Sequence, residues 1–151
     1  MALDGVYVGG ELGQISLTGT TKSVYNNAIG FGLDVGFRIN PTLDVMFQSQ
    51  MSSHSGLAPN LKIYSQTLGA NLHFGMTDFD FTLGMGPGFY TYDSGVSETH
   101  FGIHGDVGAD VVVSDGMRVG LGLRYHSLLG ATGMDDYWSL MMRVGYIFGM
   151  N

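Results

Sequence analysis

Ile29-Gly30-Phe31-Gly32-Leu33-Asp34-Val35-Gly36-Phe37-Arg38-Ile39 is the stretch that decides the fold, because apolar side chains occupy every odd position. The even positions hold glycine, one aspartate and one arginine. Since successive side chains of a β-strand point to opposite faces, this segment would have one apolar face and one face of glycine and charge. The alternation therefore predicts a strand that separates two chemically different environments.

The same alternation recurs along the rest of the chain, at residues 6–13, 43–51, 68–74, 79–86, 101–111, 119–125 and 138–148. Short turn sequences, such as Asn40-Pro41-Thr42, join neighbouring segments into three hairpins. Polar segments of about eight to eleven residues lie between the hairpins, at 17–24, 52–62, 93–100 and 129–137. Short turns that alternate with longer loops predict an all-β fold, an eight-stranded antiparallel up-and-down transmembrane β-barrel.

The glycine-rich face distinguishes a membrane barrel from a soluble one. A soluble barrel would turn its apolar face inward and expose the other face, but glycine on an exposed strand is entropically costly and offers nothing to pack. In a membrane barrel the chain's many glycines, 25 in total, would instead point into a narrow lumen and leave room for larger side chains. We therefore expect the apolar face to contact lipid.

Aromatic residues on the expected lipid face form two groups about ten residues apart along a strand, which spans about 25 Å in a tilted strand and matches the apolar band of a bilayer. We interpret the groups as two aromatic girdles. The group beside the short turns contains Phe37, Phe74, Phe79, Tyr146 and Phe148, and the group beside the long loops contains Tyr25, Tyr64, Phe89, Phe101, Tyr125 and Trp138.

Length and composition limit the alternatives. With 151 residues, we expect one transmembrane β-barrel domain over residues 1–151. The net charge is -7 and the six lysines and arginines form no cluster, which argues against nucleic-acid binding. Cysteine is absent, so no disulfide or thiolate metal site is expected. We expect a monomer in the bacterial outer membrane whose signal peptide has been removed from this chain.

Four motifs resemble the small outer-membrane barrels of the OmpA and OmpX type. They are residues 6–13 (VYVGGELG), 38–41 (RINP), 84–88 (GMGPG) and 144–148 (VGYIF). The resemblance implies an eight-stranded barrel that contacts the lipid bilayer and lipopolysaccharide. It also implies insertion by the barrel-assembly machinery, although the chain continues past Phe148 with three residues where that family usually ends on an aromatic residue.

Charged residues on the glycine face should pair inside the lumen, because an isolated buried charge is expensive. Counting from the turns places Arg38 opposite Asp44, Asp106 opposite Arg124 and His73 opposite Asp80, and closure places Arg143 near Glu11. We interpret these charges as a salt-bridged plug, with a gate formed by Arg124 and Arg143 as the alternative. The expected lumen charges are Glu11, Asp34, Arg38, Asp44, Asp80, Asp106, Asp110, Arg118, Arg124 and Arg143.

Pro87 lies within an expected strand on the lipid face, although proline cannot donate to the strand ladder. We therefore predict a local bulge or break between Gly86 and Gly88.

Three classes of function remain open: a structural or surface-interaction barrel, a narrow channel for ions or small solutes, and a lipid-modifying enzyme. Eight strands leave an interior just wide enough for side chains, which favours the first class. His126 and Ser127 faintly resemble the His and Ser of lipid A deacylase barrels, but adjacent residues face opposite sides of a strand, and His126 should point inward. The histidines and carboxylates show no metal-site spacing, so no metal is expected. We also expect no cofactor and no catalytic residue.

Overall fold

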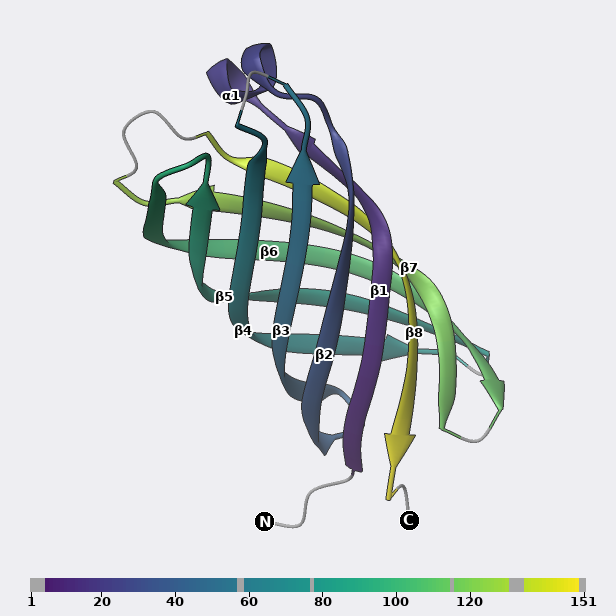
Figure 1. The fold of residues 1–151 in the computed structure, drawn as a ribbon. Coiled ribbons are helices and arrows are strands. Elements are labelled where there is room, and N and C mark those ends of the chain that lie inside the picture. Colours follow the sequence, from purple (N-terminus) through teal and green to yellow (C-terminus); the bar gives the residue numbers. More distant parts are fainter. Residues whose placement is uncertain (1–4, 57–58, 77, 115, 131–134, 150–151) are drawn as a thin grey trace.

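The computed structural model describes residues 5–56, 59–76, 78–114, 116–130 and 135–149. Eight antiparallel strands form a closed barrel in which each strand pairs with the next and the last pairs with the first (Figure 1). This architecture confirms the predicted fold. The strands are β1 (Gly5–Leu17), β2 (Ala28–Asn40), β3 (Leu43–His54), β4 (Leu61–Gly75), β5 (Phe79–Asp93), β6 (Ser97–Ser114), β7 (Met117–Leu128) and β8 (Tyr137–Phe148).

The two faces of each strand follow the predicted parity. Leu33 exposes 67% of its surface on the outer wall, whereas its neighbour Asp34 exposes 2% inside the barrel. Leu121 on β7 is likewise exposed on the outer wall. An apolar outer wall around a polar interior is stable when hydrocarbon surrounds the barrel, which supports the membrane interpretation.

Several strands extend further than the alternation indicated. β3 continues to His54 and β4 begins at Leu61, so the connecting loop is shorter than the predicted range 52–62. The loop expected at 93–100 is also shorter, because β5 ends at Asp93 and β6 begins at Ser97. Outward side chains near the loops, such as Thr91 and Thr99, are polar and hydrogen-bonded to each other at 2.8 Å. The alternation of apolar and polar residues is therefore lost there although the strands continue.

A short helix, α1 (Gly19–Val24), follows β1 in a segment that we had expected to be only a loop. It lies at the opposite end of the barrel from the start of β1 and the end of β8 (Figure 1). Among the described residues, no helix has the length and apolar character needed to cross a membrane.

Pro87 interrupts pairing on one side of β5 only. On the β6 side the ladder is continuous, with Pro87 opposite Ile103. On the β4 side, pairing stops after Ala70 with Met85 and resumes at Thr67 with Gly88, without a change of register. The structure therefore confirms a break in the ladder but shows no bulge.

Candidate functional site

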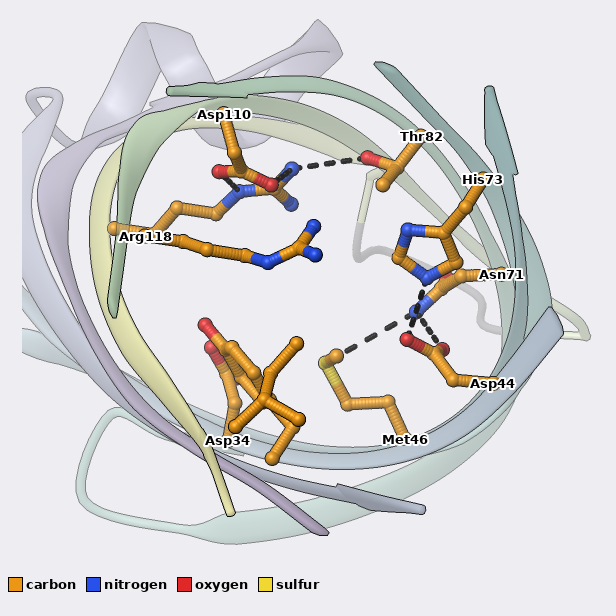
Figure 2. Close-up of a pocket in the computed structure, with 11 residues that line it drawn as sticks. Asp34, Asp44, Met46, Asn71, His73, Thr82, Asp110 and Arg118 are labelled. Atoms are coloured by element: carbon orange, nitrogen blue, oxygen red, sulfur yellow. Dashed lines mark hydrogen bonds and ion pairs between the residues drawn. The ribbon is translucent and has the colours of Figure 1, made fainter. Parts of the chain in front are cut away.

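The lower part of the lumen, nearest the short turns, contains a network of charges around Asp80. The Asp80 carboxylate accepts hydrogen bonds from Arg118 and, at 3.4 Å, from Arg38. His73 lies between two carboxylates, with Nδ1 2.9 Å from Asp80 and Nε2 2.6 Å from Asp44. Figure 2 shows Arg118 extending across the middle of the lumen, with His73 and Asp44 on the opposite wall.

The bridging position of His73 has a consequence for its protons. Ionised carboxylates only accept hydrogen bonds, and a neutral imidazole donates from one nitrogen only. Hydrogen bonds at both ring nitrogens therefore require one more proton than a neutral His73 with two ionised carboxylates contains. Either the imidazole is protonated or one carboxyl group holds the proton, so the network stores a proton inside the barrel.

A second group of ion pairs lies further from the turns. Both terminal nitrogens of Arg124 lie near the Glu11 carboxylate, at 3.2 and 3.3 Å. Arg143 donates to both oxygens of Asp110 at 2.6 and 2.7 Å, and to the Thr82 hydroxyl at 2.9 Å. These are charge-assisted, two-point contacts, which are among the strongest that side chains make.

The ion pairs differ from those predicted although the strand registers largely agree. Glu11 is the cross-strand partner of Arg143, as expected, but the expected ion pairs of Arg143 with Glu11 and of Arg124 with Asp106 are wrong. Arginine side chains are long enough to lean diagonally or reach across the lumen, so the charged tips meet partners that backbone register does not identify.

Of two further predicted pairs, one is wrong in its ion pair and the other only in its register. Arg38 lies opposite Asp44 in the ladder, as expected, but its guanidinium binds Asp80. His73 lies opposite Thr82 and not Asp80, because the turn before β5 shifts the register by two residues; the imidazole still reaches Asp80 diagonally.

Asp34 and Asp106 point into the lumen, and within the described part of the chain neither carboxylate makes an ion pair with an arginine. One oxygen of Asp34 lacks a hydrogen-bond partner among the described residues, and Asp106 lies 3.7 Å from His104 Nε2. A cavity of about 30 Å³ lies between the charged groups (Figure 2). It has room for water but not for an organic solute.

The upper part of the lumen, nearest the long loops, is apolar and aromatic. We had expected glycines, larger side chains and charges in the interior, but not a separate apolar layer. Continuing the inward parity of Glu11 along β1 would have found Ile15 and Leu17. Tyr25 and Leu128 cover the cluster, whose buried members are Ile15, Leu17, Leu61, Ile63, Tyr90, Tyr92 and Tyr137.

His126 points inward, as its parity predicted, and stacks on Tyr137 with ring centroids 4.2 Å apart. Its nitrogens lie 3.1 Å from the Ser139 hydroxyl and 3.2 Å from the Tyr90 hydroxyl. Ser127 has a different partner, Asp136. His126 and Ser139 are both 0% exposed, so this pair has no access to a lipid from the outer wall in this conformation.

Asp135 connects two loops at the outer end of the barrel. Its carboxylate accepts hydrogen bonds from the Thr21 amide at 2.8 Å and from the hydroxyls of Thr20 and Thr21 at 2.8 and 3.0 Å. The hydrogen bond from the Thr21 backbone amide is the main reason that the pKa of Asp135 lies below its ordinary value, and the bonds from the threonine hydroxyls lower it further. The neighbouring Asp136 accepts bonds from Tyr125, Ser127 and the Leu128 amide.

Most of the predicted girdle residues face outward, and one does not. Tyr25 packs against the upper apolar cluster, and its hydroxyl lies 3.5 Å from the Pro59 carbonyl. It therefore covers the barrel mouth and does not contact lipid. The outward residues include Phe37, Phe74, Phe79, Tyr146 and Phe148 near the turns, and Tyr64, Phe89, Phe101 and Trp138 near the loops; Tyr125 is partly buried against Trp138.

Residues 2–148 match the family described as outer membrane protein beta-barrel domain. The chain belongs to this family. Membership places the protein in the bacterial outer membrane and agrees with the closed barrel and its apolar outer wall. No curated protein matches the sequence.

Solved structures of other outer-membrane barrels share the fold. Neisserial surface protein A (NspA) has 18% identity and a TM-score of 0.82, covering 97% of this chain and 99% of that chain. The N-terminal barrel of Pseudomonas aeruginosa OprF has 14% identity and a TM-score of 0.69, covering 98% and 100%. The outer membrane enzyme PagL has 13% identity and a TM-score of 0.58, covering 93% and 98%.

Proposed function

We propose that this protein is a non-conducting outer-membrane barrel that has a structural or surface-interaction role and acts through its lipid-facing wall and its outer loops. The filled lumen carries the proposal. Buried ion pairs occupy its lower part and an apolar, aromatic cluster occupies its upper part. An eight-stranded barrel is only wide enough for its own side chains, so two such layers leave little space for a permeating solute.

A channel is less well supported because ions would have to cross both layers. Opening the charged layer would separate Arg124 from Glu11, and a stranded buried charge costs about 3 to 5 kcal/mol. Opening the upper layer would hydrate Tyr90, Tyr92 and Tyr137, which are 0% exposed. The proposal therefore assigns the Arg124–Glu11 pair a structural role.

An enzymatic role is also less well supported. PagL shows that the fold can host an enzyme, but catalysis requires a nucleophile and a base that a substrate can reach. The His126–Ser139 pair has suitable chemistry but is enclosed by Tyr90 and Tyr137. We propose that His126 is a packing residue of the upper layer.

The outer end offers a defined surface for interaction. α1 is connected to the segment before β8 through Asp135, and this segment is connected to β7 through Asp136. Backbone and hydroxyl hydrogen bonds hold both carboxylates, which fixes the relative positions of two loops. A pre-organised surface binds a partner at a lower entropic cost than flexible loops do.

Current recording in planar bilayers tests the proposal, with heat-modifiable migration on gels confirming that the protein used is folded. We expect no steady conductance steps from the wild-type barrel. Reproducible ohmic steps in a folded preparation would contradict the closed lumen. In a parallel assay, lipid A incubated with the protein is analysed by mass spectrometry. Loss of an acyl chain that is abolished by Ser139→Ala would contradict the non-enzymatic role.

A further inference from the structure

A groove of about 240 Å³ lies on the outer wall across β2, β3 and β4. These three strands are neighbours in the barrel (Figure 1). The residues that line the groove lie near the strand ends that adjoin the long loops. Its lining includes Ile29, Phe31, Met51, Ser53, Lys62 and Tyr64.

The two sides of the groove differ in chemistry. Ile29 and Phe31 on β2 and Met51 on β3 make one side apolar. On β4 the outward positions are Lys62, Tyr64 and Gln66, so this side is polar and carries a positive charge. The apolar and polar sides are adjacent in the sheet, because Met51 pairs with Phe31 on one side and with Tyr64 on the other.

Lys62 differs from the other five cationic side chains of the chain. Arg38, Arg118, Arg124 and Arg143 bind carboxylates in the lumen, and Lys22 belongs to α1. Of the lysines and arginines, all of which lie in the described ranges, only Lys62 is on the outer wall of the barrel.

No carboxylate within the described ranges makes an ion pair with Lys62. Asp93 is its cross-strand neighbour on β5, but Asp93 Oδ1 accepts a hydrogen bond from the Gly95 amide at 3.1 Å. A lysine at the edge of the hydrocarbon extends its ammonium group toward the headgroups. There, lipid phosphates are available to pair with the charge.

We propose that this groove binds one phosphorylated glycolipid of the outer leaflet, with a phosphate on Lys62 and one acyl chain along Ile29, Phe31 and Met51. Lysine is a common phosphate partner because its ammonium group acts as a compact point charge. Sugar hydroxyls of the headgroup would meet polar side chains beside Lys62 and Tyr64, where Ser53 and Thr91 point outward. The inference rests on the membrane orientation used above, but it does not require the lumen to be closed.

Native mass spectrometry of the detergent-solubilised barrel, titrated with bisphosphorylated lipid A, tests the proposal. We expect one lipid to bind with preference over the same lipid without phosphates. Lys62→Gln should weaken binding by about fivefold, the loss expected from one lysine at a lipid headgroup. The matched control Lys22→Gln should bind as the wild type does. Met51→Gln should weaken binding while the preference for phosphate remains.

Three results would overturn the proposal: equal affinity of the wild type and Lys62→Gln, equal affinity for the phosphate-free lipid, or complete displacement of the lipid by inorganic phosphate. The last result would show that the acyl chain contributes nothing. Because Lys62 and Met51 point outward, the variants should keep the folded migration on gels. Bilayer current is a separate readout, so failure of the lipid site would leave the closed-lumen proposal intact.

Discussion

Replacing Arg124 with methionine tests the charged layer most directly. Methionine retains much of the aliphatic stem, so the change chiefly removes the guanidinium. Arg124 is 4% exposed, and its two contacts with Glu11 measure 3.2 and 3.3 Å. Glu11 is 5% exposed, so solvent compensates little for the lost partner. We expect the free energy of unfolding to fall by about 3 to 5 kcal/mol, toward the lower end if lumen water reaches Glu11.

The measurement is reversible urea unfolding in lipid vesicles, followed through the fluorescence of Trp138, the single tryptophan of the chain. A second change, Glu11→Gln, completes a double-mutant cycle and should recover about 1 to 3 kcal/mol through the coupling between the two residues. The matched control, Lys22→Met, should change stability by less than about 0.5 kcal/mol. A loss below about 1 kcal/mol for Arg124→Met, together with additive changes, would refute the reasoning. Steady conductance in a folded Arg124→Met barrel would favour a gate instead.

Leu33→Arg should cost about 2 to 4 kcal/mol in vesicle unfolding if Leu33 lies near the bilayer midplane, and an unchanged value would mean that it does not face hydrocarbon. Gly86→Ala places a Cβ against the backbone carbonyl oxygen of Leu68 and should cost about 1 to 3 kcal/mol in the same assay. Gly10→Ala, with its nearest contact at 3.8 Å, should be nearly neutral, and equal losses would exclude a steric cause. The depressed pKa of Asp135 means that its ionised form stabilises the fold above the ordinary carboxyl pKa. The difference in melting temperature between wild type and Asp135→Asn should therefore shrink as the pH falls through that depressed pKa, and a constant difference would contradict this.

The barrel was predictable because one physical requirement acts on every strand. Side chains such as Leu33 must face hydrocarbon while neighbours such as Asp34 face the interior. In a strand this requirement produces an alternation of apolar and polar residues with a period of two, which is visible in the sequence. Pro87 was similarly informative, since a missing amide must interrupt the ladder on one side. Both inferences depend only on the backbone.

The ion pairs of the lumen were harder to predict because they depend on where side-chain tips meet. Arg143 and Glu11 are backbone neighbours, but Arg143 binds Asp110 instead. The extended ends of β5 and β6 were missed because their outward positions, such as Thr91 and Thr99, become polar there. The helix α1 gave no apolar periodicity, since none of its residues is buried.

The bonds of Asp135 also bear on how the barrel closes. The Thr21 amide and the Asp135 carboxylate belong to residues 114 positions apart. They lie above the seam where β8 pairs with β1, because one follows β1 and the other precedes β8. Hairpins in the middle of the chain form from local contacts alone. The pairing of β1 with β8 requires both ends of the chain to meet and therefore has the largest entropic cost of loop closure. Hydrogen bonds at this position slow the separation of β1 from β8 in the folded barrel. They do not interfere with the earlier formation of the hairpins.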